Sequence, residues 1–200
     1  MILSIIAIAV WVFASVQAAA LHPQIPSVES FSPAQGLNVF QLLGSILISV
    51  DSRFAKEGSP SLLDFANTFR DDLASVASLI VIPSVQVVSQ KTIQSRRTPT
   101  VYLTLNSAKQ YKLFNGNPTT EGYDIDIAHD LVTITAAAPL GAWWGTRTIL
   151  QQVVMSLSSG AKFATLPVGH ISDSPGWEVR GFMLDAGRHW FEADFMSEFI

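Results

Sequence analysis

The sequence contains no cysteine among its 200 residues, so neither a disulfide nor a cysteine-ligated metal can stabilise the fold. Small secreted modules often depend on such bridges, whereas a chain of this length can bury a full core without them. Hydrophobic residues make up 48% of the sequence. We therefore expect a domain of ordinary size that is held together by apolar packing.

An excess of positive charge is also missing. Lysine and arginine together number 12, against 16 aspartates and glutamates, and the net charge is −4. A nucleic-acid partner would require a basic stripe, so we expect no nucleic-acid binding. No repeat or low-complexity segment is present.

Several motifs that hold metals or cofactors are absent as well. No two of the four histidines stand four residues apart, as the H-E-x-x-H zinc motif requires. No Gly-x-Ser-x-Gly nucleophile motif occurs. The glycines at positions 141 and 145 enclose two tryptophans, where a phosphate-binding loop needs open backbone. We expect neither a metal nor a cofactor.

Residues 1–20 have the features of a secretory signal peptide. An apolar run covers residues 2–16, and the small residues near Ala18 and Ala20 fit a cleavage site. The pattern departs from the usual one because no lysine or arginine precedes the run. A membrane anchor is the alternative, but the run is shorter than the roughly 20 residues that span a bilayer. We expect a cleaved signal, secretion, and no membrane contact afterwards.

The middle of the chain mixes helix and strand patterns, which predicts an α+β domain over residues 37–172. Residues 21–36 contain three prolines and are expected to form an extended leader. Apolar residues recur at helical spacing over residues 60–78, where Ser61 and Asp64 have the spacing of a capping box. A second amphipathic helix is expected over residues 143–157, with the apolar side chains that face the sheet at Ile149, Leu150, Val153, Val154 and Leu157.

Strands are expected where apolar and polar residues alternate. Residues 101–105 show this period, and residues 123–127 and 131–135 form an expected hairpin. Pro83 interrupts a β-branched run, so any strand there should lie at a sheet edge or begin after the proline. Shorter extended segments are expected over residues 45–50 and 165–171.

Residues 173–200 carry the candidate site. A turn leads into the apolar run of residues 182–184, which is typical of a buried parallel strand. A polar cluster from Asp185 to His189 follows directly, and α/β proteins place ligand sites just beyond the carboxyl ends of such strands. Spacing alone leaves two interpretations of Arg188, namely a ligand-binding group or an ordinary ion pair with Asp185. A helix is expected to follow this polar cluster.

At these positions the sequence resembles glycoside hydrolase family 20, the β-N-acetylhexosaminidases. The pattern D-x-P-x-x-x-x-R-G-x-x-L-D-x-x-R-H-x-F of the first barrel strand is matched by Asp173, Pro175, Arg180, Gly181, Leu184, Asp185, Arg188, His189 and Phe191. Upstream, residues 141–152 resemble the G-x-x-x-G-x-x-T-L-x-Q helix of the family. The resemblance implies a zincin-like α+β accessory domain, a sheet covered by helices, over residues 37–172. It also implies that residues 173–200 are the truncated start of a (β/α)8 TIM barrel.

The resemblance implies a secreted enzyme that removes terminal non-reducing N-acetylhexosamine from glycans or chitin oligomers. Its mechanism would be retaining and substrate-assisted. Arg188 would donate hydrogen bonds to hydroxyls of the sugar in the −1 subsite, and Asp185 would orient it. Structural roles are expected for Arg180, His189 and the two tryptophans at positions 143 and 144. The resemblance leaves room for a homodimer of the full-length enzyme.

The Asp-Glu pair that supports catalysis in this family occurs nowhere in the sequence. Residues 173–200 also fall far short of the roughly 250 residues of a complete barrel. We therefore expect an N-terminal fragment that has no hydrolytic activity of its own, with the general acid/base beyond Ile200. The alternative is a short secreted binding or dimerisation module derived from the accessory domain. A transcript that continues past Ile200 would favour the fragment.

Overall fold

The computed structural model describes residues 20–36, 38–93, 98–181, 183, 185, 188 and 190–199. The expected signal peptide therefore lies outside the described residues, apart from Ala20. Three predicted parts of the candidate site, Phe182, Leu184 and His189, lie outside them too.

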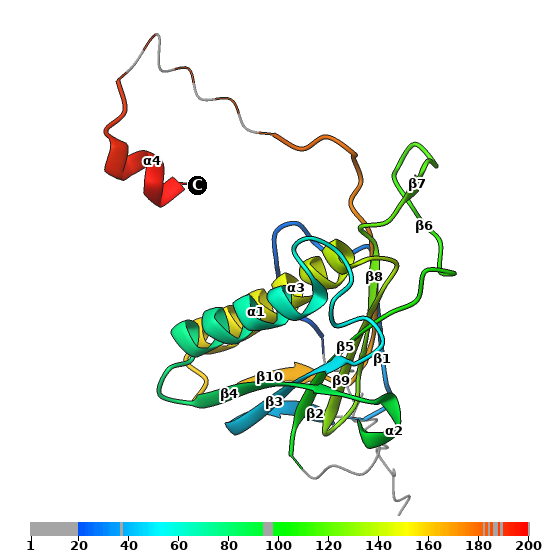
Figure 1. Cartoon of the computed structure of the whole chain (residues 1–200). Coiled ribbons are helices and arrows are strands. Elements are labelled where there is room, and N and C mark those ends of the chain that lie inside the picture. Colours follow the sequence, from blue (N-terminus) through cyan, green and yellow to red (C-terminus); the bar gives the residue numbers. More distant parts are fainter. Residues whose placement is uncertain are drawn as a thin grey trace, which may run out of the picture.

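A seven-stranded mixed sheet forms the centre of the molecule (Figure 1). Its strands in spatial order are β1 (Ser30–Pro33), β11 (Gly169–Asp173), β8 (Tyr123–Ile127), β9 (Leu131–Ala136), β5 (Thr100–Leu105), β3 (Gly44–Asp51) and β4 (Val81–Val88). The run from β9 to β4 is parallel, while β1, β11 and β8 pair in antiparallel fashion. Two small ribbons complete the strands: β2 (Val39–Leu42) with β10 (Ala164–Pro167), and β6 (Tyr111–Lys112) with β7 (Pro118–Thr119). The predicted hairpin and the predicted α+β class are confirmed.

Two long helices, α1 (Leu62–Val76) and α3 (Pro139–Ser158), lie side by side on one face of this sheet (Figure 1). Ser61 caps α1, and Asp64 completes the predicted capping box by accepting a hydrogen bond from the Ser61 backbone N–H. The short helix α2 (Gln90–Ile93) follows β4, and α4 (Ala193–Phe199) lies at the end of the described chain. The prediction that a helix follows the polar cluster is therefore confirmed.

The core lies between the sheet and the two helices. Alternate strand residues such as Ile48, Val101 and Ile134 are fully buried there, because successive side chains of a strand point to opposite faces. The helix α3 approaches the sheet closely at Gly145, where a Cβ atom would lie 2.7 Å from Ile134 Cγ2. Close approach of helix and sheet thus explains why the second glycine of the G-x-x-x-G motif has no side chain.

The edge strand β4 contains Pro83, as predicted for a strand with an internal proline. Gly44 N donates to Ile80 O and Ser52 N donates to Val88 O, so even-numbered residues of β4 hydrogen-bond to β3. The backbone nitrogen of Pro83 therefore points away from β3, toward the open edge of the sheet. Because proline has no N–H, it offers no hydrogen-bond donor there to an additional strand.

The structure differs from the sequence predictions at α3, at the expected barrel strand and over residues 165–171, which form parts of two strands, β10 and β11. The helix α3 begins at Pro139 instead of residue 143, and Val154, which was expected to face the sheet, is 38% exposed. The predicted barrel strand is not confirmed, because Met183 belongs to no strand and is 87% exposed. A parallel strand needs a hydrogen-bonded neighbour on the sheet, and no described strand pairs with Met183.

Candidate functional site

Asp185 and Arg188, the two predicted sugar-binding residues, form an ion pair. Arg188 Nε lies 3.0 Å from Asp185 Oδ2. The side chain of Arg188 is 90% exposed and that of Asp185 is 49% exposed. The Asp185 carboxylate therefore holds the Arg188 guanidinium at its Nε side, while the rest of the guanidinium faces solvent. This geometry suits a donor to a ligand, and it equally suits a surface ion pair.

The segment that carries these residues begins at Asp173, which is anchored twice. Tyr123 donates its hydroxyl hydrogen to Asp173 Oδ2 at 2.7 Å, and the backbone N–H of Glu29 donates to Oδ1 at 3.0 Å. Burial raises the pKa of the Tyr123 hydroxyl well above its usual range, and the negative charge of Asp173 raises it further. The hydroxyl therefore stays protonated and remains a donor.

The next residues are held against the β6–β7 ribbon. Ser174 Oγ donates to Lys112 O at 2.7 Å, and Phe114 N donates to Gly176 O at 3.0 Å. The rings of Phe114 and Trp177 meet edge to face at 6.0 Å. A side chain at Gly176 would collide with the Phe114 ring, because the nearest ring atom lies 2.3 Å from its Cβ position.

Arg180 is fixed by polar contacts with α3 and with the loop between β7 and β8. Its guanidinium pairs with Glu121 and lies 5.5 Å from the centre of the Trp144 ring, and Trp144 Nε1 donates to the same Glu121 oxygen at 2.7 Å. Arg180 also donates to Trp177 O at 2.6 Å. Arg180 and Trp144 therefore make polar and packing contacts of the kind that the expected structural roles require.

Trp143 lies on the α1 side of α3. Its ring packs at 5.2 Å from that of Phe65, and the Arg147 guanidinium stands 3.7 Å above it. Both tryptophans are half-buried, in agreement with the predicted packing role.

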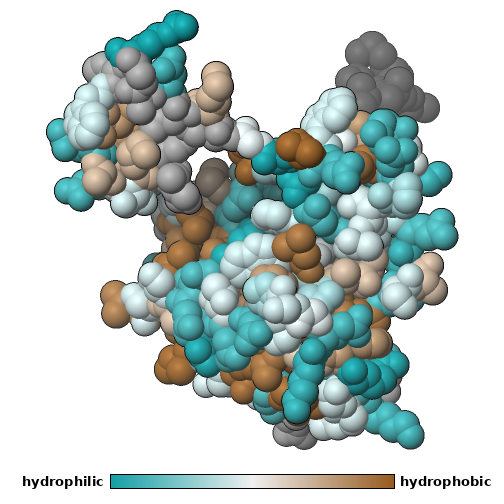
Figure 2. Space-filling view, turned by 45° about the horizontal axis from the view of Figure 1, so that its top comes forward, coloured by the Kyte–Doolittle hydropathy of each residue, from teal (hydrophilic) through white to brown (hydrophobic). Residues whose placement is uncertain are grey.

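A cleft of about 680 Å³ opens between the leader, α3 and the segment that follows Asp173. Its lining includes Tyr123, Trp144, Arg147, Trp177 and Arg180. Figure 2 shows the molecule hollowed between its last residues and the rest of the body, with apolar surface at the edge of the hollow. Neither Asp185 nor Arg188 is among the described residues that line the cleft.

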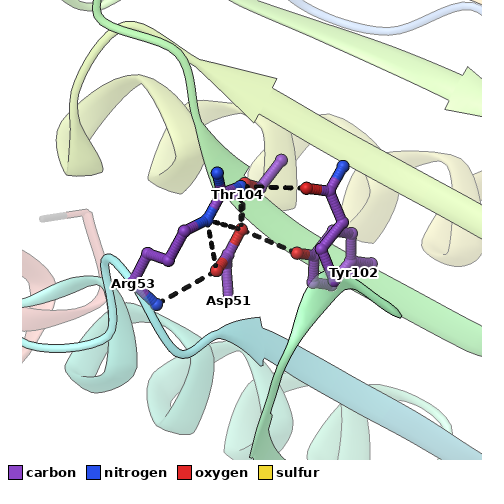
Figure 3. Close-up of polar contacts among 5 residues, drawn as sticks. Asp51, Arg53, Tyr102 and Thr104 are labelled. Atoms are coloured by element: carbon purple, nitrogen blue, oxygen red, sulfur yellow. Dashed lines mark hydrogen bonds and ion pairs between the residues drawn. The ribbon is translucent and has the colours of Figure 1, made fainter. Parts of the chain in front are cut away.

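A second polar site was not predicted from the sequence. Asp51, the last residue of β3, is fully buried, and its carboxylate accepts hydrogen bonds from Arg53, Tyr102 and Thr104 (Figure 3). Burial alone would raise the pKa of Asp51, but these hydrogen bonds outweigh burial and hold the pKa well below its ordinary value of 3.8. An acid at the end of an apolar strand followed by an arginine is the signal that could have identified it.

The described residues carry neither a cluster of metal ligands nor a membrane-spanning helix. Over that part of the chain no three histidine or carboxylate side chains come together in a way that could hold a metal ion. Within the same residues, none of the helices has the length and apolar character needed to cross a membrane.

The sequence profile described as glycosyl hydrolase family 20, domain 2, matches residues 22–174. Among solved structures, an N-acetyl-β-hexosaminidase from Streptomyces plicatus is 22% identical, with 92% of this chain and 32% of that chain covered at a TM-score of 0.59. A β-N-acetylhexosaminidase from Bacteroides fragilis is 19% identical, with 88% and 29% covered at 0.58. A Flavobacterium johnsoniae chitobiase is 24% identical, with 84% and 23% covered at 0.53.

These likenesses show a common fold. The chain spans about a third or less of the length of the solved structures that it matches. The family match ends at Ser174 and does not include Asp185 or Arg188.

Proposed function

Since the chain belongs to glycosyl hydrolase family 20 through its domain 2, we propose that it forms the N-terminal part of a secreted β-N-acetylhexosaminidase. The observation that carries the proposal is the family match over residues 22–174, which ends within the segment anchored at Asp173. Residues 37–172 would be the zincin-like accessory domain. Residues 173–200 would begin the catalytic barrel.

The substrate would be a terminal non-reducing N-acetylhexosamine on a glycan or a chitin oligomer. The matched solved structures include hexosaminidases and a chitobiase, which supports this substrate class. Which glycan is preferred would depend on pocket walls that these residues do not supply.

The role of Arg188 in this proposal follows from its geometry. A guanidinium presents several fixed N–H donors, so it can bond two neighbouring sugar hydroxyls at once. Asp185 accepts from Arg188 Nε and would hold the guanidinium plane in place. The sugar's own acetamide would attack the anomeric carbon, as in other substrate-assisted glycosidases.

The accessory domain would fix the direction in which the chain enters the barrel. Asp173 binds Tyr123 of β8, Gly176 binds Phe114 of the loop after β6, and Arg180 binds Glu121 of the loop before β8. A domain that anchors its neighbour in this way would lower the entropy cost of placing Arg188.

The chain of 200 residues should be unable to hydrolyse substrate. It contains no Asp-Glu pair to orient the acetamide and protonate the leaving group, and a general acid/base typically contributes 10²–10⁴-fold to the rate. The purified chain would be assayed with a chromogenic N-acetylglucosaminide. Turnover that scales with chain concentration and is blocked by an oxazoline analogue would contradict this part of the proposal.

A second candidate function is a short secreted binding or dimerisation module without catalysis. The cleft of about 680 Å³ beside Trp144 and Trp177 favours it, because such a surface can receive a partner. A transcript from the source organism that ends at Ile200, together with a stable dimer in solution, would favour the module. A transcript that continues into an Asp-Glu pair would favour the enzyme.

A further inference from the structure

The face of the sheet that lies away from α1 and α3 carries a polar row. Thr104 of β5 pairs with Thr135 of β9, and Thr135 pairs with Asp124 of β8. On the other side, Thr104 Oγ1 donates to Asp51 of β3 at 2.8 Å. Four neighbouring strands therefore each contribute one polar side chain to a single line across the sheet.

Both carboxylates in this row are neutralised by a basic residue. Asp51 pairs with Arg53, and Asp124 pairs with Lys109 and accepts from the Tyr111 hydroxyl at 2.9 Å. The surface between the two carboxylates therefore carries two threonine hydroxyls and little net charge.

Asp51 holds Arg53 in a fixed position (Figure 3). Arg53 Nη2 lies 2.7 Å from Asp51 Oδ2, and Arg53 Nε lies 3.1 Å from Oδ1. The carboxylate is fully buried and is already occupied by Arg53, Tyr102 and Thr104, whereas the Arg53 side chain is 57% exposed. The buried acid thus positions the arginine and leaves part of the guanidinium open to a ligand.

A pocket of about 420 Å³ lies beside this arginine at the carboxyl ends of β3 and β5. Its polar lining consists of Arg53, Gln90, Thr104, Asn106, Ser107 and Thr135. Over the described part of the chain, no hydrogen bond is made by the Thr135 hydroxyl, the Ser107 hydroxyl or the side-chain nitrogen of Gln90. In open α/β sheets ligands bind outside the carboxyl ends of parallel strands.

We propose that this pocket is a second binding site, separate from Arg188, and that it takes a neutral polyhydroxylated ligand, a single sugar residue of a glycan. Its volume falls within the range of small-molecule sites. Hydroxyl and amide groups match the mixed donors and acceptors of a sugar. An anion is disfavoured, because the charge of Arg53 is already balanced by Asp51.

The test is an NMR titration of the purified chain, with the amide signals followed residue by residue. The probes are N-acetylglucosamine, chitotriose and inorganic phosphate. Saturable shifts are expected with the sugars at Thr104, Asn106, Ser107 and Thr135, with a Kd on the order of 1 mM for a single sugar site.

Two matched variants locate the ligand. Thr135→Val removes one hydroxyl and keeps a β-branched side chain, so the strand should remain folded. It should weaken sugar binding roughly three- to tenfold, the effect of one lost hydrogen bond. Thr133→Val changes the same strand on the same face, outside the pocket lining, and should leave the affinity unchanged.

Three results would overturn the proposal. The first is an absence of shifts at these residues with both sugars. The second is equal affinity in the chain and in Thr135→Val, and the third is binding of phosphate without binding of sugar. Failure of this binding site is distinguishable from failure of the proposed function, because the titration measures binding at the pocket and needs no hydrolysis. Arg188→Lys, which tests the proposed function, should leave the shifts at Thr104 and Thr135 unchanged.

Discussion

Tyr123 and Asp173 are register partners on β8 and β11, and their side chains are joined by a hydrogen bond of 2.7 Å. Asp173 is the last residue of β11 and the first of the segment that leads to Asp185 and Arg188. This contact therefore fixes the direction in which the chain leaves the sheet.

Tyr123→Phe should loosen that exit. The variant loses the bonds to Asp173 and to Thr148 Oγ1, and it should lower the free energy of unfolding by about 1–3 kcal/mol. Urea denaturation measures the loss, and hydrogen exchange should become faster at residues 174–180. Tyr102→Phe loses a similar bond to Asp51 and serves as the control. Equal exchange at residues 174–180 in both variants would contradict the anchoring role.

Asp51 should make stability depend on acid pH. The folded pKa of Asp51 lies below its ordinary value of 3.8, so the network contributes stability above that value and loses it as pH falls through the folded pKa. Unfolding free energy measured from about pH 5 to pH 2 should fall less steeply in Asp51→Asn than in the parent chain. Asp51→Asn should also cost about 2 kcal/mol near neutral pH, because Arg53 loses its partner. Equal slopes of unfolding free energy against pH in Asp51→Asn and in the parent chain would contradict this role of Asp51.

Which face of α3 packs on the sheet can be tested with two separate variants, each of which places an aspartate on a different face of the helix. Ile149 is fully buried, whereas Val154 is 38% exposed. Ile149→Asp should unfold the domain, because a buried unpaired charge is costly, and Val154→Asp should change stability by no more than about 0.5 kcal/mol. Circular dichroism melting curves would measure both. Similar melting of the two variants would mean that the helix is turned differently.

Gly145→Ala tests the close approach of α3 to the sheet. Alanine favours a helix by about 1 kcal/mol over glycine, but the added Cβ would stand 2.7 Å from Ile134 Cγ2. We expect net destabilisation of about 1–3 kcal/mol from the overpacked core. Ser158→Ala, on the exposed end of the same helix, provides the control. A more stable Gly145→Ala variant would show that the sheet tolerates the methyl group.

Local patterns predicted those elements whose signals are complete within a few residues. The capping box at Ser61 and Asp64 and the alternation in β5 are of this kind. The start of α3 was missed, because Pro139 follows small residues that show no clear period. The position of β1 next to β11 could not be predicted, since its partner residues are about 140 positions away along the chain.

The Asp185–Arg188 pair and the Asp51 network also differ in how far apart their residues lie along the chain. Asp185 and Arg188 are three residues apart, so their ion pair could be inferred from spacing. The Asp51 network needs Tyr102, which lies 51 residues further along the chain and reaches Asp51 only because β3 and β5 are neighbours. Long-range pairing of strands therefore created a site that no short motif indicated.

The sugar-binding role proposed for Arg188 is tested by kcat/KM of Arg188→Lys in the full-length β-N-acetylhexosaminidase that we propose this chain begins. Lysine keeps the charge and loses the fork of donors, so kcat/KM should fall roughly 5- to 150-fold, which corresponds to about 1–3 kcal/mol. Arg70→Lys, on the exposed side of α1, should leave kcat/KM unchanged, and both variants should keep the parent melting temperature. Full activity in Arg188→Lys, or a loss that only follows unfolding, would contradict the claim and leave Arg188 as a structural partner of Asp185.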